Sequence, residues 1–326
     1  MTGLWACYHS DGEIRSGLTR PDIERALLSG QGTLWVDIDI RDPEAVSLLS
    51  EVFHFHPLAI EDALNPQSRV KIEEYSHFLI LIVRTIGFVA QTEDPYDIET
   101  VNLTCFLGRN YLVTAHSGDK SPIDQTRDVL DKKPELASAG PSRLMHAVID
   151  EAVNAYFPIL DQLEEFMDTL EEKVFASFDQ TAMREIFSVK RLVLSLRRHL
   201  APERDVFTVL TNRPSSLLSP DAQVYFRDIY DHVLRINDSL ETYRELLSNT
   251  LDSYLTQVSN RLGSVTKALS VVATVSLPFV VVSGMWGMNF DEIPLAHTSH
   301  GFWTMLAVQI GLGALLLALL RWRKFL

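Results

Sequence analysis

Hydrophobic residues gather in two uncharged runs towards the end of the chain. Residues 268–290 form a run of 23 without a charged side chain. Residues 293–320 add 28 more, interrupted only by His297 and His300. An α-helix rises about 1.5 Å per residue, so roughly 20 apolar residues cross a bilayer. The pattern predicts two membrane-spanning helices, and a buried core hairpin is the alternative.

The charges that flank these runs predict their orientation. Arg261 and Lys267 precede the first run, and the basic segment 321–324 follows the second. The connecting loop, residues 291–300, contains neither Lys nor Arg. Basic residues favour the cytoplasmic side of a membrane. We therefore expect both termini in the cytoplasm and the loop outside.

The first 140 residues have an α/β pattern. Runs rich in β-branched and aromatic residues, bounded by Gly, Asp and Asn, predict strands at 34–40, 78–86, 101–107 and 111–116. Proline in a first turn predicts helices at 21–28 and 57–64. His54 and His56 form an H-x-H pair, but no further metal ligands cluster nearby in the sequence. A capping or buried role beside Pro57 is the favoured interpretation.

After residue 141 the apolar positions follow a helical repeat. Steps of four and three connect two sets, which are Tyr156, Leu160, Leu163, Met167, Leu170 and Val174, then Ile229, Val233, Ile236, Leu240, Tyr243 and Leu247. This spacing is typical of a coiled-coil seam. A further helix is expected at about 181–200.

One very long helix is predicted to enter the membrane. Ser219-Pro220-Asp221 is a helix start signal, and no other proline occurs before Pro278. A helix over 220–277 would be on the order of 85 Å long. Such a helix needs partners, and two spans per chain are too few to enclose a pore. We expect an oligomer.

Composition excludes several classes of protein. The 326 residues carry a net charge of −14, which argues against a nucleic-acid-binding protein. Residues 261–326 hold five basic and two acidic groups, so residues 1–260 carry −17. That acidity would concentrate cations, or it would simply aid solubility. Cys7 and Cys105 lack metal-ligand spacing, no signal peptide is expected, and no common hydrolase or nucleotide-binding motif is present. We do not expect an enzyme.

Several segments together resemble one family. They are the tripeptide Gly287-Met288-Asn289, HPLAIEDALN at 56–65, KIEEY at 71–75, YFRDIYDH at 225–232 and the basic ending. The chain is similar to the CorA family of divalent-cation (magnesium/cobalt) transport proteins, a metal ion transporter superfamily with the Gly-Met-Asn motif. The resemblance implies an α+β membrane protein of the inner membrane that assembles as a homopentamer.

The resemblance also divides the chain. It implies an N-terminal α/β cytoplasmic domain (1–140), long coiled-coil-like helices that form a funnel (141–262) and a first transmembrane, pore-lining helix (263–290). An extracytoplasmic loop (291–300) and a second transmembrane helix with a basic tail (301–326) complete it.

The family's selectivity filter would be formed here by Gly287, Met288 and Asn289. A ring of neutral Asn289 amides would accept hydrogen bonds from the tightly held water shell of Mg²⁺. A helix C-cap is the other role open to Asn289. The matching pore-lining positions are Gly263, Thr266, Leu269, Ala273, Leu277, Val280 and Gly284.

The resemblance further implies regulation by cytosolic Mg²⁺ between subunits. The matching carboxylates are Glu61, Asp62, Asp150 and Asp228. Asp291 and Glu292 lie in the outer loop. Departures from the family are Leu262-Gly263 in place of a Thr-Asn pair, Val280 in place of a hydroxyl, and the added His297 and His300. Loop histidines could favour softer ions such as Zn²⁺.

Three hypotheses follow. The first is a channel for Mg²⁺, also passing Co²⁺ or Ni²⁺, driven by the membrane potential and closed by cytosolic Mg²⁺. The second is a zinc transporter of the same superfamily, with or without coupling to protons. The third is a membrane-anchored coiled-coil sensor or scaffold that conducts nothing. The expected partners are further copies of the chain, the lipid bilayer and divalent cations, with no nucleic acid.

Overall fold

The computed structural model describes residues 3–89, 92, 94–117, 122–176, 180–212, 215–288, 293–295 and 298–323. The chain forms two units, Met1–Thr250 and Leu251–Leu326. Each unit is described by itself.

A seven-stranded sheet organises the first unit, with strand order β2-β1-β3-β7-β6-β5-β4. The strands are β1 (Leu4–Ser10), β2 (Glu13–Ser16), β3 (Thr33–Asp39), β4 (Lys71–Glu74), β5 (Leu79–Phe88), β6 (Ile98–Leu107) and β7 (Tyr111–His116). Strands β3 and β7 are parallel, and the other neighbours are antiparallel. The four predicted strands are confirmed as β3, β5, β6 and β7, whereas β1, β2 and β4 were not predicted.

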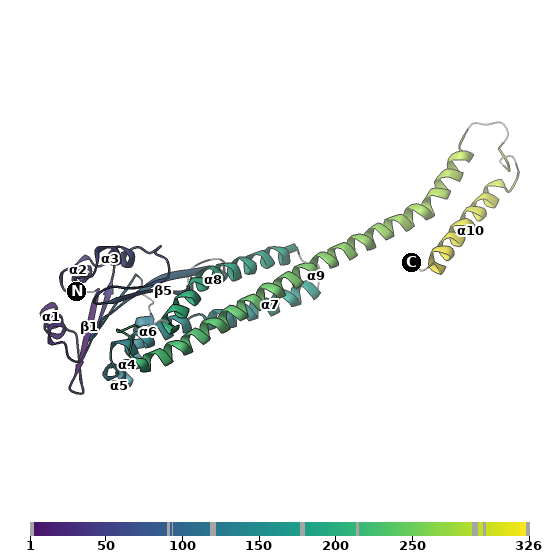
Figure 1. Cartoon of the computed structure of the whole chain (residues 1–326). Coiled ribbons are helices and arrows are strands. Elements are labelled where there is room, and N and C mark those ends of the chain that lie inside the picture. The colour runs from purple at the N-terminus through teal and green to yellow at the C-terminus, as the bar shows by residue number, and fades with distance from the viewer. Residues whose placement is uncertain are drawn as a thin grey trace. The chain divides into compact units, whose positions relative to one another are not determined.

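Helices cover both faces of this sheet (Figure 1). Those on one face are α1 (Arg20–Ser29), α2 (Pro43–Glu51) and α3 (Pro57–Leu64), whose apolar residues share a core with alternate positions of the strands. Those on the other face are α4 (Pro122–Lys132), α5 (Glu135–Ser138) and α6 (Pro141–Asn154). The expected role of His56 is confirmed, because its Nδ1 accepts a 3.2 Å hydrogen bond from the backbone N–H of Leu58 and caps α3.

Three long helices follow, namely α7 (Phe157–Ala176), α8 (Gln180–Asn212) and α9 (Pro220–Trp286). The predicted apolar seams of α7 and α9 are buried, except that Tyr243 is half-buried. Helix α8 continues past the predicted end near residue 200, with Pro202 inside it. Glu203, the next residue, is fully buried, and its carboxylate accepts a hydrogen bond from the backbone N–H of Arg84 in β5. This tertiary contact fixes the helix where local sequence rules would end it.

The expected start of α9 is confirmed, because the Ser219 hydroxyl accepts a 3.2 Å hydrogen bond from the backbone N–H of Ala222. From Leu251 onwards α9 belongs to the second unit, together with α10 (Gly301–Trp322). Both helices contain an 18-residue window of mean hydropathy 2.0, of which only 6% is buried. They are long and apolar enough to cross a membrane. In a buried core hairpin, by contrast, most residues of these windows would be buried.

Candidate functional site

The stripe predicted to line a pore lies on the exposed surface of α9. All seven residues from Gly263 to Gly284 are exposed in the single chain. Leu269 and Val280, both 66% exposed, are as open as surface side chains although they are fully apolar. Apolar side chains exposed at regular helical spacing require lipid or other protein around them. The stripe is therefore available to face other copies of the chain.

Helix α9 ends at the Gly-Met-Asn motif. The backbone N–H of Gly287 donates to the carbonyl oxygens of Ser283 at 3.0 Å and Gly284 at 3.2 Å, which tightens the last turn. Met288 follows and is exposed. Asn289, Asp291, Glu292 and His297 lie outside the described residues. The filter role of Asn289 and the role of the outer-loop acids remain predictions.

Two contacts join α9 to α10 below the motif, and sequence reasoning missed both. The side-chain amide Nε2 of Gln309 donates to Ser283 Oγ at 3.3 Å. A Cβ on Gly313 would come within 2.7 Å of the Phe279 ring, so the ring occupies a notch that only glycine leaves. One available signal was that Gln309 is the only amide side chain in residues 293–320.

Two of the predicted regulatory carboxylates lie on either side of one histidine. His232 on α9 has Nδ1 3.8 Å from Asp150 Oδ1 on α6 and Nε2 3.8 Å from Asp228 Oδ2, one turn earlier on α9. Asp150 Oδ1 and His232 Nδ1 are buried and make no hydrogen bond. The Asp228 side chain is 68% exposed. The structure thus brings Asp150 and Asp228 together, and His232 is the residue that sequence reasoning overlooked.

Burial shapes the charge of this cluster, which is formed by Asp150, Asp228, His232 and the neighbouring His146. Burial raises the pKa of Asp150, and the nearby negative charge of Asp228 raises it further, against the opposing effect of His232. Burial and the Arg143 guanidinium lower the pKa of His146 to about 4, so this imidazole is neutral near pH 7. A cation bound between two neighbouring carboxylates would offset the repulsion between their charges.

The other two predicted regulatory acids have a different environment. Asp62 Oδ2 on α3 forms an ion pair with Lys71 Nζ at 2.6 Å. The same Nζ also lies 3.0 Å from Glu73 Oε1. Glu61 is exposed on the same helix. Lys71 was not singled out from the sequence, although it belongs to the KIEEY segment. Its charge partly neutralises Asp62 in the single chain.

No group of three or more His, Cys, Asp or Glu in the described ranges could hold a metal ion. The cluster on α6 and α9 therefore offers a partial set of ligands. Octahedral Mg²⁺ keeps several waters and takes one or two carboxylates, so a partial set suits it when further oxygens come from elsewhere. Asp228 is the carboxylate of this cluster that is open to solvent.

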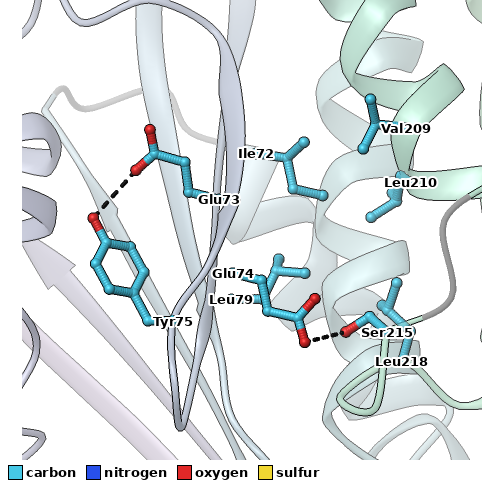
Figure 2. Close-up of a pocket in the computed structure, with 9 residues that line it drawn as sticks. All are labelled: Ile72, Glu73, Glu74, Tyr75, Leu79, Val209, Leu210, Ser215 and Leu218. Carbon is cyan, nitrogen blue, oxygen red and sulfur yellow. Dashed lines mark hydrogen bonds between the residues drawn. The ribbon is translucent and has the colours of Figure 1, made fainter.

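A separate pocket of about 360 Å³ lies between β4 and the end of α8 (Figure 2). Its walls are polar and apolar in about equal measure, and its two acids already have partners. Glu73 Oε2 accepts from the Tyr75 hydroxyl at 3.2 Å, and Glu74 Oε1 accepts from the Ser215 hydroxyl at 3.2 Å. Both carboxylates are thus engaged in hydrogen bonds to neighbouring hydroxyl groups.

Comparisons with known proteins identify the family. The family model described as "CorA-like Mg2+ transporter protein" matches residues 30–323. The chain is 30% identical to the putative metal ion transporter YfjQ of Bacillus subtilis over 92% of this chain and 91% of that protein. It is 27% identical to the cobalt/magnesium transport protein CorA of Thermotoga maritima over 90% of this chain and 83% of that protein.

A solved structure shares the fold. The complete CorA magnesium transporter of Methanocaldococcus jannaschii superposes with a TM-score of 0.84 at 23% identity, covering 98% of this chain and 97% of that one. The soluble α/β unit, the long helix and the pair of apolar helices all have counterparts there. The chain belongs to the CorA-like Mg²⁺ transporter family.

Proposed function

We propose that this chain is a divalent-cation channel that carries Mg²⁺, and also Co²⁺ or Ni²⁺, across the inner membrane. Divalent-cation transport is the function of the family to which the chain belongs. The observation that carries the finer proposal is the exposed, uncharged stripe of α9, which leads directly to Gly287 and Met288. A pore face of this kind gives no charged trap in which a divalent ion would stay bound.

The proposed assembly is a homopentamer with α9 innermost and both termini in the cytoplasm. Two membrane helices per chain cannot surround a pore, whereas five copies of α9 can. The exposure of Leu269, Leu277 and Val280 supports this assembly, because each would otherwise face lipid or water without a protein neighbour. These apolar rings would close the pore by expelling water.

The driving force in this proposal is the membrane potential. Moving a divalent ion across 100 mV is worth about 4.6 kcal/mol, so no coupled reaction is needed. Cytosolic Mg²⁺ would close the channel by binding between subunits, at Asp150 and Asp228 of one chain and Glu61 and Asp62 of the next. When the ion leaves, the uncompensated carboxylates repel each other and loosen the interface.

Flux measurements into proteoliposomes test this proposal. Mg²⁺, Co²⁺ and Zn²⁺ are compared under an imposed potential, each with and without a pH gradient. Mg²⁺ flux that follows the potential and ignores the pH gradient is the expected result. Zn²⁺ flux that follows the proton gradient would establish the zinc-transporter alternative instead. If no ion is transported, the channel proposal is wrong, and the hypothesis of a non-conducting sensor or scaffold is the one that remains.

A further inference from the structure

A polar contact connects the two apolar helices of the second unit. Gln309 lies in the middle of α10, and its Nε2 donates to Ser283 Oγ of α9 at 3.3 Å. An amide side chain in a hydrocarbon environment is costly unless its hydrogen-bonding groups find partners. The contact therefore specifies which face of α10 turns towards α9.

A steric contact one turn away reinforces the same arrangement. Phe279 precedes Ser283 by four residues, and Gly313 follows Gln309 by four. The Phe279 ring lies where a Cβ of Gly313 would be, within 2.7 Å. Because residues four apart share a helix face, both contacts lie along one seam between the antiparallel helices. The polar pair and the notch thus fix the position of α10 along α9 and its rotation.

A pocket of about 490 Å³ borders this seam, and Ser283, Trp286 and Gly287 of α9 and Gln309 of α10 are among the residues that line it. The turn of α9 that leads into the Gly-Met-Asn motif therefore borders an open groove of the single chain. Ser283 lines this pocket, and its carbonyl oxygen accepts a 3.0 Å hydrogen bond from the N–H of Gly287. One residue thus links the seam to the motif.

We propose that Gln309 is a positioning residue for ion selection: through its hydrogen bond to Ser283, it holds the turn that presents Gly287-Met288-Asn289. This inference rests on the proposed channel function, because it assigns ion discrimination to that motif. A side chain on the outer helix then affects which ion passes without touching the ion. Loss of the hydrogen bond leaves the Phe279 notch in place but lets the last turn of α9 move over the pocket.

The first test measures selectivity. The ratio of Mg²⁺ to Co²⁺ flux is compared in Gln309→Leu, Ser283→Ala and the double variant, with oligomer content measured in parallel. We expect each single change to alter the ratio by roughly threefold, the size of effect that an interhelical hydrogen bond in a membrane supports. The double variant should be no worse than either single one. Ser283→Thr, which keeps a hydroxyl, should stay closer to the unaltered ratio than Ser283→Ala.

A matched control separates positioning from stability. Thr304 lies on the same helix, and its hydroxyl bonds to the carbonyl oxygen of His300 in its own chain segment. Thr304→Val therefore removes a polar group from α10 without breaking a contact with α9, and the flux ratio should not change. If Gln309→Leu lowers the flux of both ions equally, in proportion to lost oligomer, Gln309 has a structural role only and the proposal is wrong.

The second test does not depend on transport. Met288→Cys places a thiol at the exposed residue that follows Gly287, and its reaction rate with a membrane-impermeant maleimide reports the position of the motif. The native thiols should react slowly, because Cys7 and Cys105 are buried and burial raises the pKa of Cys7 to about 12. Adding Gln309→Leu should change the rate by roughly threefold. An unchanged rate overturns the positioning role, whereas absent flux in the unaltered protein overturns only the channel function.

Discussion

Glu203 on α8 accepts a 2.7 Å hydrogen bond at Oε1 from the backbone N–H of Arg84 on β5. Arg84 is the centre of a wider network, since its side chain also reaches Asn102, His199 and the carbonyl oxygen of Ser68. Glu203 Oε2 is buried without a hydrogen-bond partner. The long helix and the sheet are therefore joined by a carboxyl group that favours its protonated form.

This contact predicts a pH-dependent stability. Burial raises the pKa of Glu203 from 4.5 to about 8, although the Arg84 backbone N–H and charge oppose the shift. Between these two values the native chain holds a proton that the unfolded chain has lost, so this group's contribution to stability falls as pH rises. Glu203→Gln should flatten the fall in apparent Tm between about pH 5 and about pH 8. Thermal unfolding in detergent measures this slope.

The exposed Glu165 on α7 provides the control. Glu165→Gln removes a carboxylate of the same type without changing a buried contact, so its pH slope should equal that of the unaltered chain. A Glu203→Gln slope as steep as this control would show that the buried proton does not govern the pH dependence.

The acidic cluster predicts a weaker response to Mg²⁺ when one of its carboxylates is removed. Asp228→Asn should raise the internal Mg²⁺ concentration that halves the flux by roughly tenfold, within the usual range for allosteric coupling. Asp231→Asn, an exposed neighbour on α9, should leave it unchanged. Proteoliposomes loaded with graded Mg²⁺ provide the measurement. Equal responses in the two variants would exclude a specific role for Asp228.

Removing the charge of Lys71 should change the internal Mg²⁺ concentration that halves the flux in the opposite direction. Its ion pair with Asp62, 2.6 Å long, occupies a carboxylate that the proposed interface needs. Lys71→Gln frees that carboxylate, so less internal Mg²⁺ should suffice to halve the flux. Lys133→Gln removes one positive charge at an exposed site on another part of the surface and should have no such effect. A higher Mg²⁺ requirement in Lys71→Gln would contradict the proposed interface.

The notch between α9 and α10 predicts that two glycines on α10 differ in how much stability is lost when each is replaced by alanine. Gly313→Ala drives a Cβ into the Phe279 ring, whereas Gly311 has open space around its Cα. Overpacking of this kind typically costs about 1–3 kcal/mol. We expect Gly313→Ala to lower the apparent Tm in detergent and Gly311→Ala to leave it nearly unchanged. Similar values for the two variants would refute the notch.

The proposed filter predicts that Asn289→Ala abolishes transport while the oligomer stays intact. Loss of the amide oxygens removes the groups that would accept hydrogen bonds from the hydrated ion. Size-exclusion chromatography monitors the oligomer, and Mg²⁺ flux monitors the function. Undiminished flux would assign Asn289 a helix-capping role alone.

Local patterns in the sequence predicted the elements that are apolar on a regular period. The seams of α7 and α9, the strands β3 and β7 and the caps at His56 and Ser219 follow from spacing and cap chemistry. The short strand β4 and the outer strands β1 and β2 carry weaker alternation, because each lies at or near an edge of the sheet. The continuation of α8 through Pro202 depends on Arg84, which is 119 residues away from Glu203, and no local rule could reveal it.

In the candidate site, too, local patterns could be predicted from the sequence, whereas contacts between distant residues could not. The stripe on α9 was identified from the family resemblance, and its three- and four-residue spacing places it on one helix face. The Gly-Met-Asn motif was recognised by its position between the two uncharged runs. His232 between two carboxylates, Lys71 on Asp62 and Gln309 on Ser283 are contacts across elements, so their partners could not be identified from spacing. The presence of a His, Lys or Gln at such a position has many ordinary structural explanations. Only the distance to a named partner indicates a specific role.

The Phe279 notch has a consequence for how homologous chains can vary in length. Each residue of an α-helix turns the next by about 100°, so a single insertion between Gln309 and Gly313 would rotate the glycine away from the ring. The three intervening residues can change without rotating the glycine, provided that it stays four positions after the amide. For this seam, the spacing of Gln309 and Gly313 therefore matters more than the identity of the three residues between them.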